Sequence, residues 1–390
     1  MLAALILFPA YARIFPEVGM DVRPMYVFSS YRDDVLKNML PPGEAYKTVG
    51  GTSLHLKYGF TFSPDTKEGH IFPGAWQGIG SSVNLFGNMK GTGVPVCLYL
   101  FQGAPVWRIS SRLSLYYEWN FGASFGWKTC DGHVATSNLI TGTKVNAYIN
   151  LGAGLRWEPS HNWALTAGLD LTHFSNGNTS FPNPGMNMAG VRIGITRSFG
   201  IPSSAKDLSD SGIIRSELST ASEGRHSRWP GFDVTIYGAW RKRVYRGGEE
   251  PILLNGHFPI AGLDLSPMWK VTQNFRAGPS VDLQWDESSN LRPNYATGST
   301  ADDIRFYRPA FFSQVSCGLS ARAELVMPIF SLNVGIGYNI IGPEEARASY
   351  QLANLKIRLV KGLFLNIGYQ LLDFSRQNNL MLGFGYSFNS

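Results

Sequence analysis

The feature that most constrains the fold is a period-two alternation of apolar and polar side chains, repeated along much of the chain. Alternate side chains of a β-strand point to opposite faces, so this pattern predicts strands with one apolar and one polar face. Several runs reach ten residues or more, whereas strands of soluble β-sandwiches usually have about 5–6 residues. One such run places these residues on its apolar face: Leu113, Leu115, Tyr117, Trp119, Phe121, Ala123, Phe125 and Trp127.

Such strands are typical of a transmembrane β-barrel, whose outer face is apolar and whose lumen is lined by small or polar side chains. The composition agrees, since the 390 residues include 43 glycines and 13% aromatics, and only 16% are charged. After the N-terminus there is no run of 18 or more apolar residues, which argues against a helical membrane protein. The sequence therefore predicts an all-β, antiparallel transmembrane barrel protein with about sixteen strands in total.

The strands fall into two groups of about eight, and each group ends on an alternating strand that closes with an aromatic residue. We predict two tandem eight-stranded barrels, residues 13–200 and 229–390, joined by a polar linker at 201–228. The alternative is one barrel of about sixteen strands with a long internal excursion. Residues 1–12 resemble the end of a signal peptide, with an apolar run before Ala10-Tyr11-Ala12.

Connection lengths predict the orientation, because outer-membrane barrels have short periplasmic turns and long outer loops. A short turn falls at 159–161 and a long connection at 128–143. The strand that follows the short turn, residues 163–175, therefore runs outward, and its end is expected near the outer leaflet.

That outer end carries a histidine and a serine where lipid contact is expected. His173 and Ser175 share the apolar face with Leu169 and Leu171. Same-face neighbours in a strand are about 6.5–7 Å apart at Cα, so the two side chains can reach hydrogen-bond distance. A base beside a hydroxyl nucleophile is what attack on an ester carbonyl requires. A barrel has little structural reason to place this pair against hydrocarbon, so we predict a lipid esterase site.

The next strand, residues 187–199, places Asn187 on the same face. Its amide oxygen could accept a hydrogen bond from the imidazole and fix the tautomer, as the asparagine of Cys-His-Asn sites does. Asp170 and Thr172 have the opposite parity and are expected to pack inside the barrel.

The segment His173-Phe174-Ser175-Asn176, followed by Pro182-Asn183-x-Gly185-x-Asn187, resembles the active-site segment of outer-membrane lipid A 3-O-deacylases of the PagL type. The resemblance covers roughly residues 18–199 and implies an eight-stranded barrel that hydrolyses the ester at position 3 of lipid A. It implies that His173 is the base and Ser175 the nucleophile. It also implies an oxyanion hole, to which the Asn176 backbone or the Asn183 side chain would contribute.

The sequence departs from this family at Asn187, which stands where the family has an acid. Asparagine lacks the charge that stabilises an imidazolium, and replacing the acid of a serine protease by asparagine lowers kcat by about 10⁴. That asparagine entered a site built for aspartate, whereas Asn187 is native to its site. We therefore expect a reduced or retuned activity.

The predicted function is an outer-membrane serine esterase that removes an ester-linked acyl chain from lipopolysaccharide in the outer leaflet, without metal or cofactor. Two alternatives remain, a non-enzymatic barrel (a pore or a structural protein) and an esterase or acyltransferase acting on phospholipid. The net charge of +6 fits anionic lipid headgroups, and no recognition helix or zinc spacing supports nucleic acid as a partner. The expected partners are lipid A and the membrane, and assembly as a homodimer is left open. The second half carries no histidine–serine pair of this kind, and its role is left open.

Overall fold

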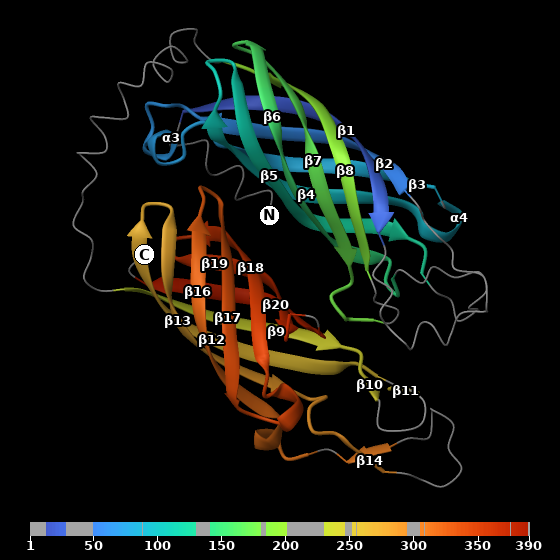
Figure 1. The fold of residues 1–390 in the computed structure, drawn as a ribbon. Helices are drawn as coiled ribbons and strands as arrows, with labels where there is room; N and C mark the ends of the chain where they lie inside the picture. Colours follow the sequence, from blue (N-terminus) through green and yellow to red (C-terminus); the bar gives the residue numbers. More distant parts are fainter. Residues whose placement is uncertain are drawn as a thin grey trace. The chain divides into compact units, whose positions relative to one another are not determined.

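The protein folds into two closed antiparallel barrels of eight strands each (Figure 1). The computed structural model describes residues 13–28, 50–87, 89–129, 141–180, 185–200, 230–245, 252–254, 256–294, 305–307, 309–374 and 376–388. The all-β fold and the tandem arrangement predicted from the sequence are confirmed, and the alternative of one barrel with about sixteen strands is wrong. The predicted signal segment 1–12 and linker 201–228 lie outside the described residues.

In the first barrel the strands follow one another in sequence order, and β1 pairs with both β2 and β8, which closes the sheet. Closure leaves no unpaired edge, as a barrel in a membrane requires. The strands are β1 (Ile14–Phe28), β2 (Gly50–Phe62), β3 (Trp76–Phe86), β4 (Gly93–Arg108), β5 (Leu113–Trp127), β6 (Val145–Ser160), β7 (Trp163–Ser175) and β8 (Met186–Ser198).

The two ends of the first barrel differ in the connections they carry. We call one end the turn end, since it holds the connections 63–75, 109–112 and 161–162, and the other the loop end, since it holds 29–49, 87–92, 128–144 and 176–185. Two short helices, α3 (Lys67–Ile71) and α4 (Met89–Thr92), lie within these connections. Among the described residues, no helix is long and apolar enough to cross a membrane.

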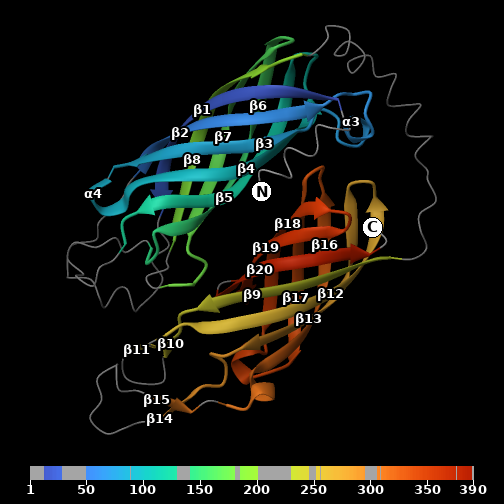
Figure 2. The ribbon, with the colours of Figure 1, turned by 180° about the vertical axis from the view of Figure 1, so that it is seen from behind.

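The second barrel closes through β9, which pairs with both β12 and β20 (Figure 2). Its strands are β9 (Gly231–Arg241), β12 (Phe258–Thr272), β13 (Phe275–Asp286), β16 (Val315–Val326), β17 (Phe330–Ile341), β18 (Ser349–Val360), β19 (Leu363–Leu372) and β20 (Arg376–Phe388). Two small hairpins lie outside this sheet, β10 (Val244–Tyr245) with β11 (Ile252–Leu253), and β14 (Arg292–Asn294) with β15 (Arg305–Tyr307). Two short 3₁₀ helices, η4 (Phe311–Gln314) and η5 (Glu344–Ala346), complete the described elements.

Strand parity separates an exposed from a buried face along much of the described strands, although some residues expected on the exposed face, such as Phe60 and Trp119, are buried. Along β2, for example, Leu54, Leu56 and Tyr58 are exposed, while the alternate positions are buried. Trp127 was expected on the outer face, but it is 3% exposed and packs inside the barrel against Phe86 and Phe174. The register between β4 and β5 shifts close to this point, and Gly126 adopts a φ of 88°. A bulge of this kind reverses the parity of the residues beyond it.

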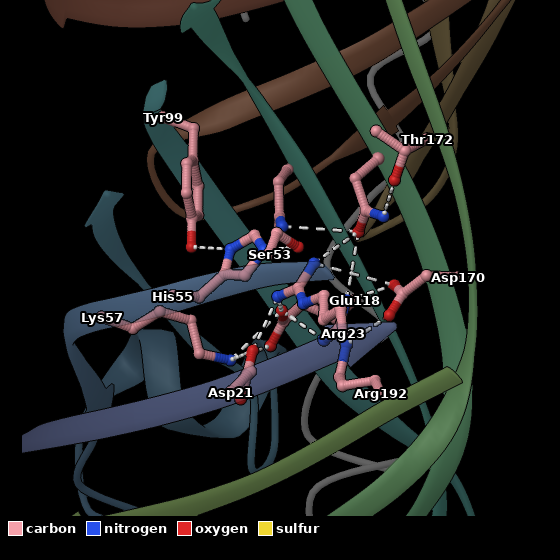
Figure 3. Close-up of polar contacts among 12 residues, drawn as sticks. Asp21, Arg23, Ser53, His55, Lys57, Tyr99, Glu118, Asp170, Thr172 and Arg192 are labelled. Carbon is pink, nitrogen blue, oxygen red and sulfur yellow. Dashed lines mark hydrogen bonds and ion pairs between the residues drawn. The ribbon is translucent and has the colours of Figure 1, made fainter. Parts of the chain in front are cut away.

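The interior of the first barrel is filled by side chains rather than open. Near the loop end an aromatic cluster includes Tyr148, Phe174, Phe86 and Trp127. Further along the lumen, three cationic and three acidic side chains form a buried network across the barrel (Figure 3). Its members are Asp21, Arg23, Lys57, Glu118, Asp170 and Arg192.

Candidate active site

The predicted pair His173 and Ser175 lies at the loop end of β7, on the outer face of the first barrel. The preceding residues of that face, Leu169 and Leu171, are 69% and 56% exposed, whereas His173 and Ser175 are half-buried. Phe174, between them, points inward and packs at 5.1 Å from the Trp127 ring and 5.3 Å from the Tyr148 ring. This packing fixes the parity of the strand end, so the pair faces outward.

Asn187 completes a hydrogen bond with the imidazole from the neighbouring strand. The register of β7 with β8 pairs His173 directly with Asn187, and the imidazole Nδ1 lies 2.7 Å from the amide Oδ1. An amide oxygen can only accept, so Nδ1 carries the proton and donates. Nε2 is therefore left with its lone pair free, which is the tautomer that a general base needs.

Ser175 lies beside this imidazole, and the two side chains flank one glycine. A Cβ built on Gly185 would stand 3.2 Å from Cε1 of His173 and 3.5 Å from Cβ of Ser175. Among the described residues, the structure records no hydrogen bond between the Ser175 hydroxyl and the imidazole. Such contacts are often long in substrate-free enzymes and tighten when substrate binds, so the pair stays a candidate.

Of the two residues expected to support an oxyanion, Asn176 lies among the described residues and Asn183 does not. Asn176 follows β7 directly and is buried, with 5% of its surface exposed. The site therefore brings together His173, Ser175, Asn187 and the chain at Asn176, while the position of Asn183 stays a prediction.

A row of small side chains leads away from Ser175 across the outer face. Ser175 pairs with Ala147 on β6, which leads to Ala123 on β5. The flanking outward positions are large, with the exposed Phe125 and Val145 on one side and the half-buried Phe121 and the exposed Ile149 on the other. Neighbouring strands are about 4.8 Å apart, so the row extends about 10 Å from Ser175 to Ala123. Because its side chains are small, this apolar strip forms a shallow depression between the larger flanking side chains.

This row slopes away from the loop end of the barrel. Ser175 is the last residue of β7, Ala147 is two residues inside the end of β6, and Ala123 is four residues inside the end of β5. The slope follows from the stagger that any closed barrel of tilted strands must have. The row therefore descends from the loop end toward the middle of the barrel.

Behind the site, the buried network holds β7 to its neighbours (Figure 3). Arg192 of β8 donates to Asp170 at 2.5 and 2.9 Å, and it also donates to Glu118 of β5. Asn150 of β6 donates to the Thr172 hydroxyl at 2.9 Å. The expectation that Asp170 and Thr172 pack inside the barrel is confirmed, and the sequence pattern did not reveal that Arg192 is their neighbour. These contacts cross the β7–β8 and β6–β7 interfaces and join β8 to β5 across the lumen. They therefore support the register of β7 with β8 that places His173 opposite Asn187.

The second barrel has a similar buried interior but no comparable site. Asp282 accepts hydrogen bonds from Arg322 at 2.6 Å and from Tyr350 at 2.5 Å, and Lys356 donates to Asp233 at 2.7 Å. Residues 231–390 contain a single histidine, His257, which is exposed in the connection before β12. In the described part of this barrel, no His–Ser pair shares an outward strand face.

Comparisons with known protein families match both halves of the chain. Residues 52–196 match the family model described as lipid A 3-O-deacylase (PagL), and residues 231–390 match the model described as acyloxyacyl hydrolase, C-terminal domain. No curated protein sequence matches the chain.

Solved structures with some similarity include a surface protein, a receptor and an autotransporter domain. Neisserial surface protein A is 12% identical, with a TM-score of 0.31, over 47% of this chain and 97% of its own. A ferric enterobactin receptor mutant of Pseudomonas aeruginosa is 9% identical, with a TM-score of 0.24, over 93% and 69%. The β domain of the Bordetella autotransporter BrkA is 9% identical, with a TM-score of 0.20, over 97% and 99%. These scores are low, so the fold rests on the strand pairing described above.

Proposed function

We propose that this chain, whose residues 52–196 match the lipid A 3-O-deacylase (PagL) family model, is an outer-membrane serine esterase that removes an acyl chain from lipid A. The observation that carries this proposal is the hydrogen bond between His173 and Asn187 beside Ser175, on the face of the barrel that meets lipid. A base in the correct tautomer next to a hydroxyl is the minimum that acyl transfer requires.

The proposed reaction proceeds through an acyl-serine. Nε2 of His173 takes the proton of Ser175 Oγ while Oγ attacks the ester carbonyl carbon. The tetrahedral oxyanion then collapses, and the sugar hydroxyl leaves with the proton from the imidazolium. Water attacks the acyl-serine, its proton passes through His173 back to Ser175, and the fatty acid is released. The Asn176 backbone and the Asn183 side chain are the proposed donors to the oxyanion.

The outer surface around Ser175 supports a lipid substrate. We place the loop end of the barrel at the outer leaflet, because outer-membrane barrels carry their longer connections there. The row through Ala147 and Ala123 then runs from the membrane surface into the hydrocarbon. An acyl chain lying on this strip would be flanked by Ile149 and Val145 while its carbonyl reaches Ser175.

The filled interior argues against the alternative of a pore. Arg23, Glu118 and Arg192 are each at most 2% exposed, and they are joined across the lumen of the first barrel. Eight strands enclose only enough space for side chains. The charges in the lumen are therefore explained by their contacts with one another, and they do not require a continuous path of water. The phospholipid alternative uses the same dyad and is tested together with the main proposal.

The test is mass spectrometry of lipid A from membranes that carry the wild-type protein or Ser175→Ala. The wild type should yield lipid A lighter by one acyl chain, and the variant should not. Ser81→Ala is the matched control, since Ser81 is a half-buried serine on the outer face of β3 in the same barrel. A deacylated product from Ser175→Ala would refute the proposed nucleophile. Release of fatty acid from phospholipid alone would refute lipid A as the substrate.

A further inference from the structure

We propose that Gly185 determines specificity, because its missing side chain leaves room beside Ser175 for the bulky sugar alcohol of the ester. This inference rests on the proposed esterase function and extends it to the leaving-group side of the site. The register of β7 with β8 pairs Phe174 with Met186, and one further step places Gly185 opposite Ser175. Gly185 is thus the nearest residue to the nucleophile on the side away from Ala147.

The backbone at Gly185 lies against both members of the dyad. A Cβ added there would meet the Phe174 carbonyl oxygen at 2.8 Å, Cε1 of His173 at 3.2 Å and Cβ of Ser175 at 3.5 Å. The residue also has a φ of 71°, a conformation that glycine adopts without steric cost. Any side chain at this position would occupy the space next to Cβ of Ser175 and the imidazole of His173.

The slope of the outer face indicates which part of the substrate meets Gly185. From Ser175 the row of small residues descends through Ala147 and Ala123, and this is the side for the apolar acyl chain. Gly185 lies on the opposite side, just beyond the end of β8 at the loop end. An ester that spans the interface has its alcohol on the polar side of the carbonyl. The alcohol of the substrate, a sugar ring, therefore lies over Gly185.

This arrangement predicts discrimination by the size of the alcohol. A single methyl group on residue 185 should obstruct a sugar ring, whereas a small alcohol would still fit. One methylene more or less in a binding site changes kcat/KM by about 10- to 200-fold. The Gly185→Ala variant should therefore lose at least about tenfold more activity on lipid A than on an ester of a small alcohol.

The experiment compares kcat/KM of the purified, refolded full chain for lipid A and for methyl laurate, a fatty acid ester whose alcohol is only methanol. Gly200→Ala is the matched control, because Gly200 has a φ of 73° with nothing within 4 Å of an added Cβ. The control bears the same cost of a positive φ without the close contacts that an added Cβ makes at Gly185, and it should leave the ratio of the two rates unchanged. Both substrates are measured on one sample, so the ratio does not depend on the folded fraction. If Gly185→Ala does not fold, Gly185→Asn replaces it, since asparagine tolerates positive φ.

The outcomes separate this inference from the proposed function. An unchanged ratio in Gly185→Ala, with Ser175→Ala inactive on both substrates, overturns the role of Gly185 and leaves the esterase proposal intact. An equal loss on both substrates also overturns it, because that result indicates displacement of the dyad. Activity of Ser175→Ala on lipid A refutes the esterase proposal itself.

Discussion

Replacing Asn187 by aspartate tests whether a missing charge limits this site. The amide Oδ1 already lies 2.7 Å from Nδ1 of His173, and aspartate has nearly the same shape. The change therefore adds a charge without altering the tautomer. Two unit charges about 4 Å apart attract by about 1 kcal/mol in water and about 4 kcal/mol at an effective dielectric of 20. His173 is half-buried, so we expect about 2 kcal/mol of added stabilisation of the imidazolium, on the order of thirtyfold in kcat.

The assay measures the rate of acyl release from lipid A by purified protein in detergent micelles, with Ser175→Ala as the blank. Asn187→Leu is the matched variant, because it keeps the size of the side chain and removes the acceptor. It should lower kcat by about 10²-fold or more, because nothing then fixes the tautomer. Equal or lower activity of Asn187→Asp, with the barrel folded, would refute the argument that charge is what the site lacks. Full activity of Asn187→Leu would show that Asn187 does not orient the imidazole.

Two further predictions concern the barrel interior. Arg192→Met leaves the buried carboxylates of Glu118 and Asp170 without their main partner, so the barrel should lose about 3–5 kcal/mol of unfolding free energy. The temperature at which the folded band is lost on a semi-native gel measures this, and an unchanged temperature would contradict the role given to the network. Ser53→Ala removes a hydroxyl that lies 2.8 Å from Nε2 of His55 inside the lumen. It should leave acyl release at the wild-type rate, and a large loss would mean that the lumen pair takes part in the reaction.

The sequence predicted the strands and the outward parity of the dyad because both follow from local alternation. The polarity of each residue in a strand indicates on which face its side chain lies. This prediction needs no information from distant segments of the chain. Trp127 could not be placed by this reasoning because its face depends on a register shift between Gly93 and Val96 on the neighbouring strand β4. An aromatic residue can lie on either face of a small barrel, so the polarity of Trp127 did not indicate that it points inward.

The buried network could not be predicted for a different physical reason. Arg192 and Glu118 are hydrogen-bonded although they are 74 residues apart in the sequence, and so are Arg23 and Asn150, which are 127 residues apart. Which charges meet depends on the closure and the stagger of the barrel, and strand alternation says nothing of either. The partners therefore appear only once the sheet is closed. The same limit applies to Gly185, whose importance lies in what a Cβ would touch on β7.

Two serine–histidine pairs in this barrel show why parity, and not spacing, selects the candidate site. Ser53 and His55 are two residues apart on β2, as His173 and Ser175 are on β7, and they form a hydrogen bond of 2.8 Å. Both are buried in the lumen, where His55 also meets the Tyr99 hydroxyl at 2.8 Å. The better-formed pair is thus closed to any lipid, whereas the outer pair is the one that an acyl chain can reach. Because the lumen is filled, a site that acts on lipid must lie on the outer face, and a shift of one residue in strand parity would turn His173 and Ser175 inward.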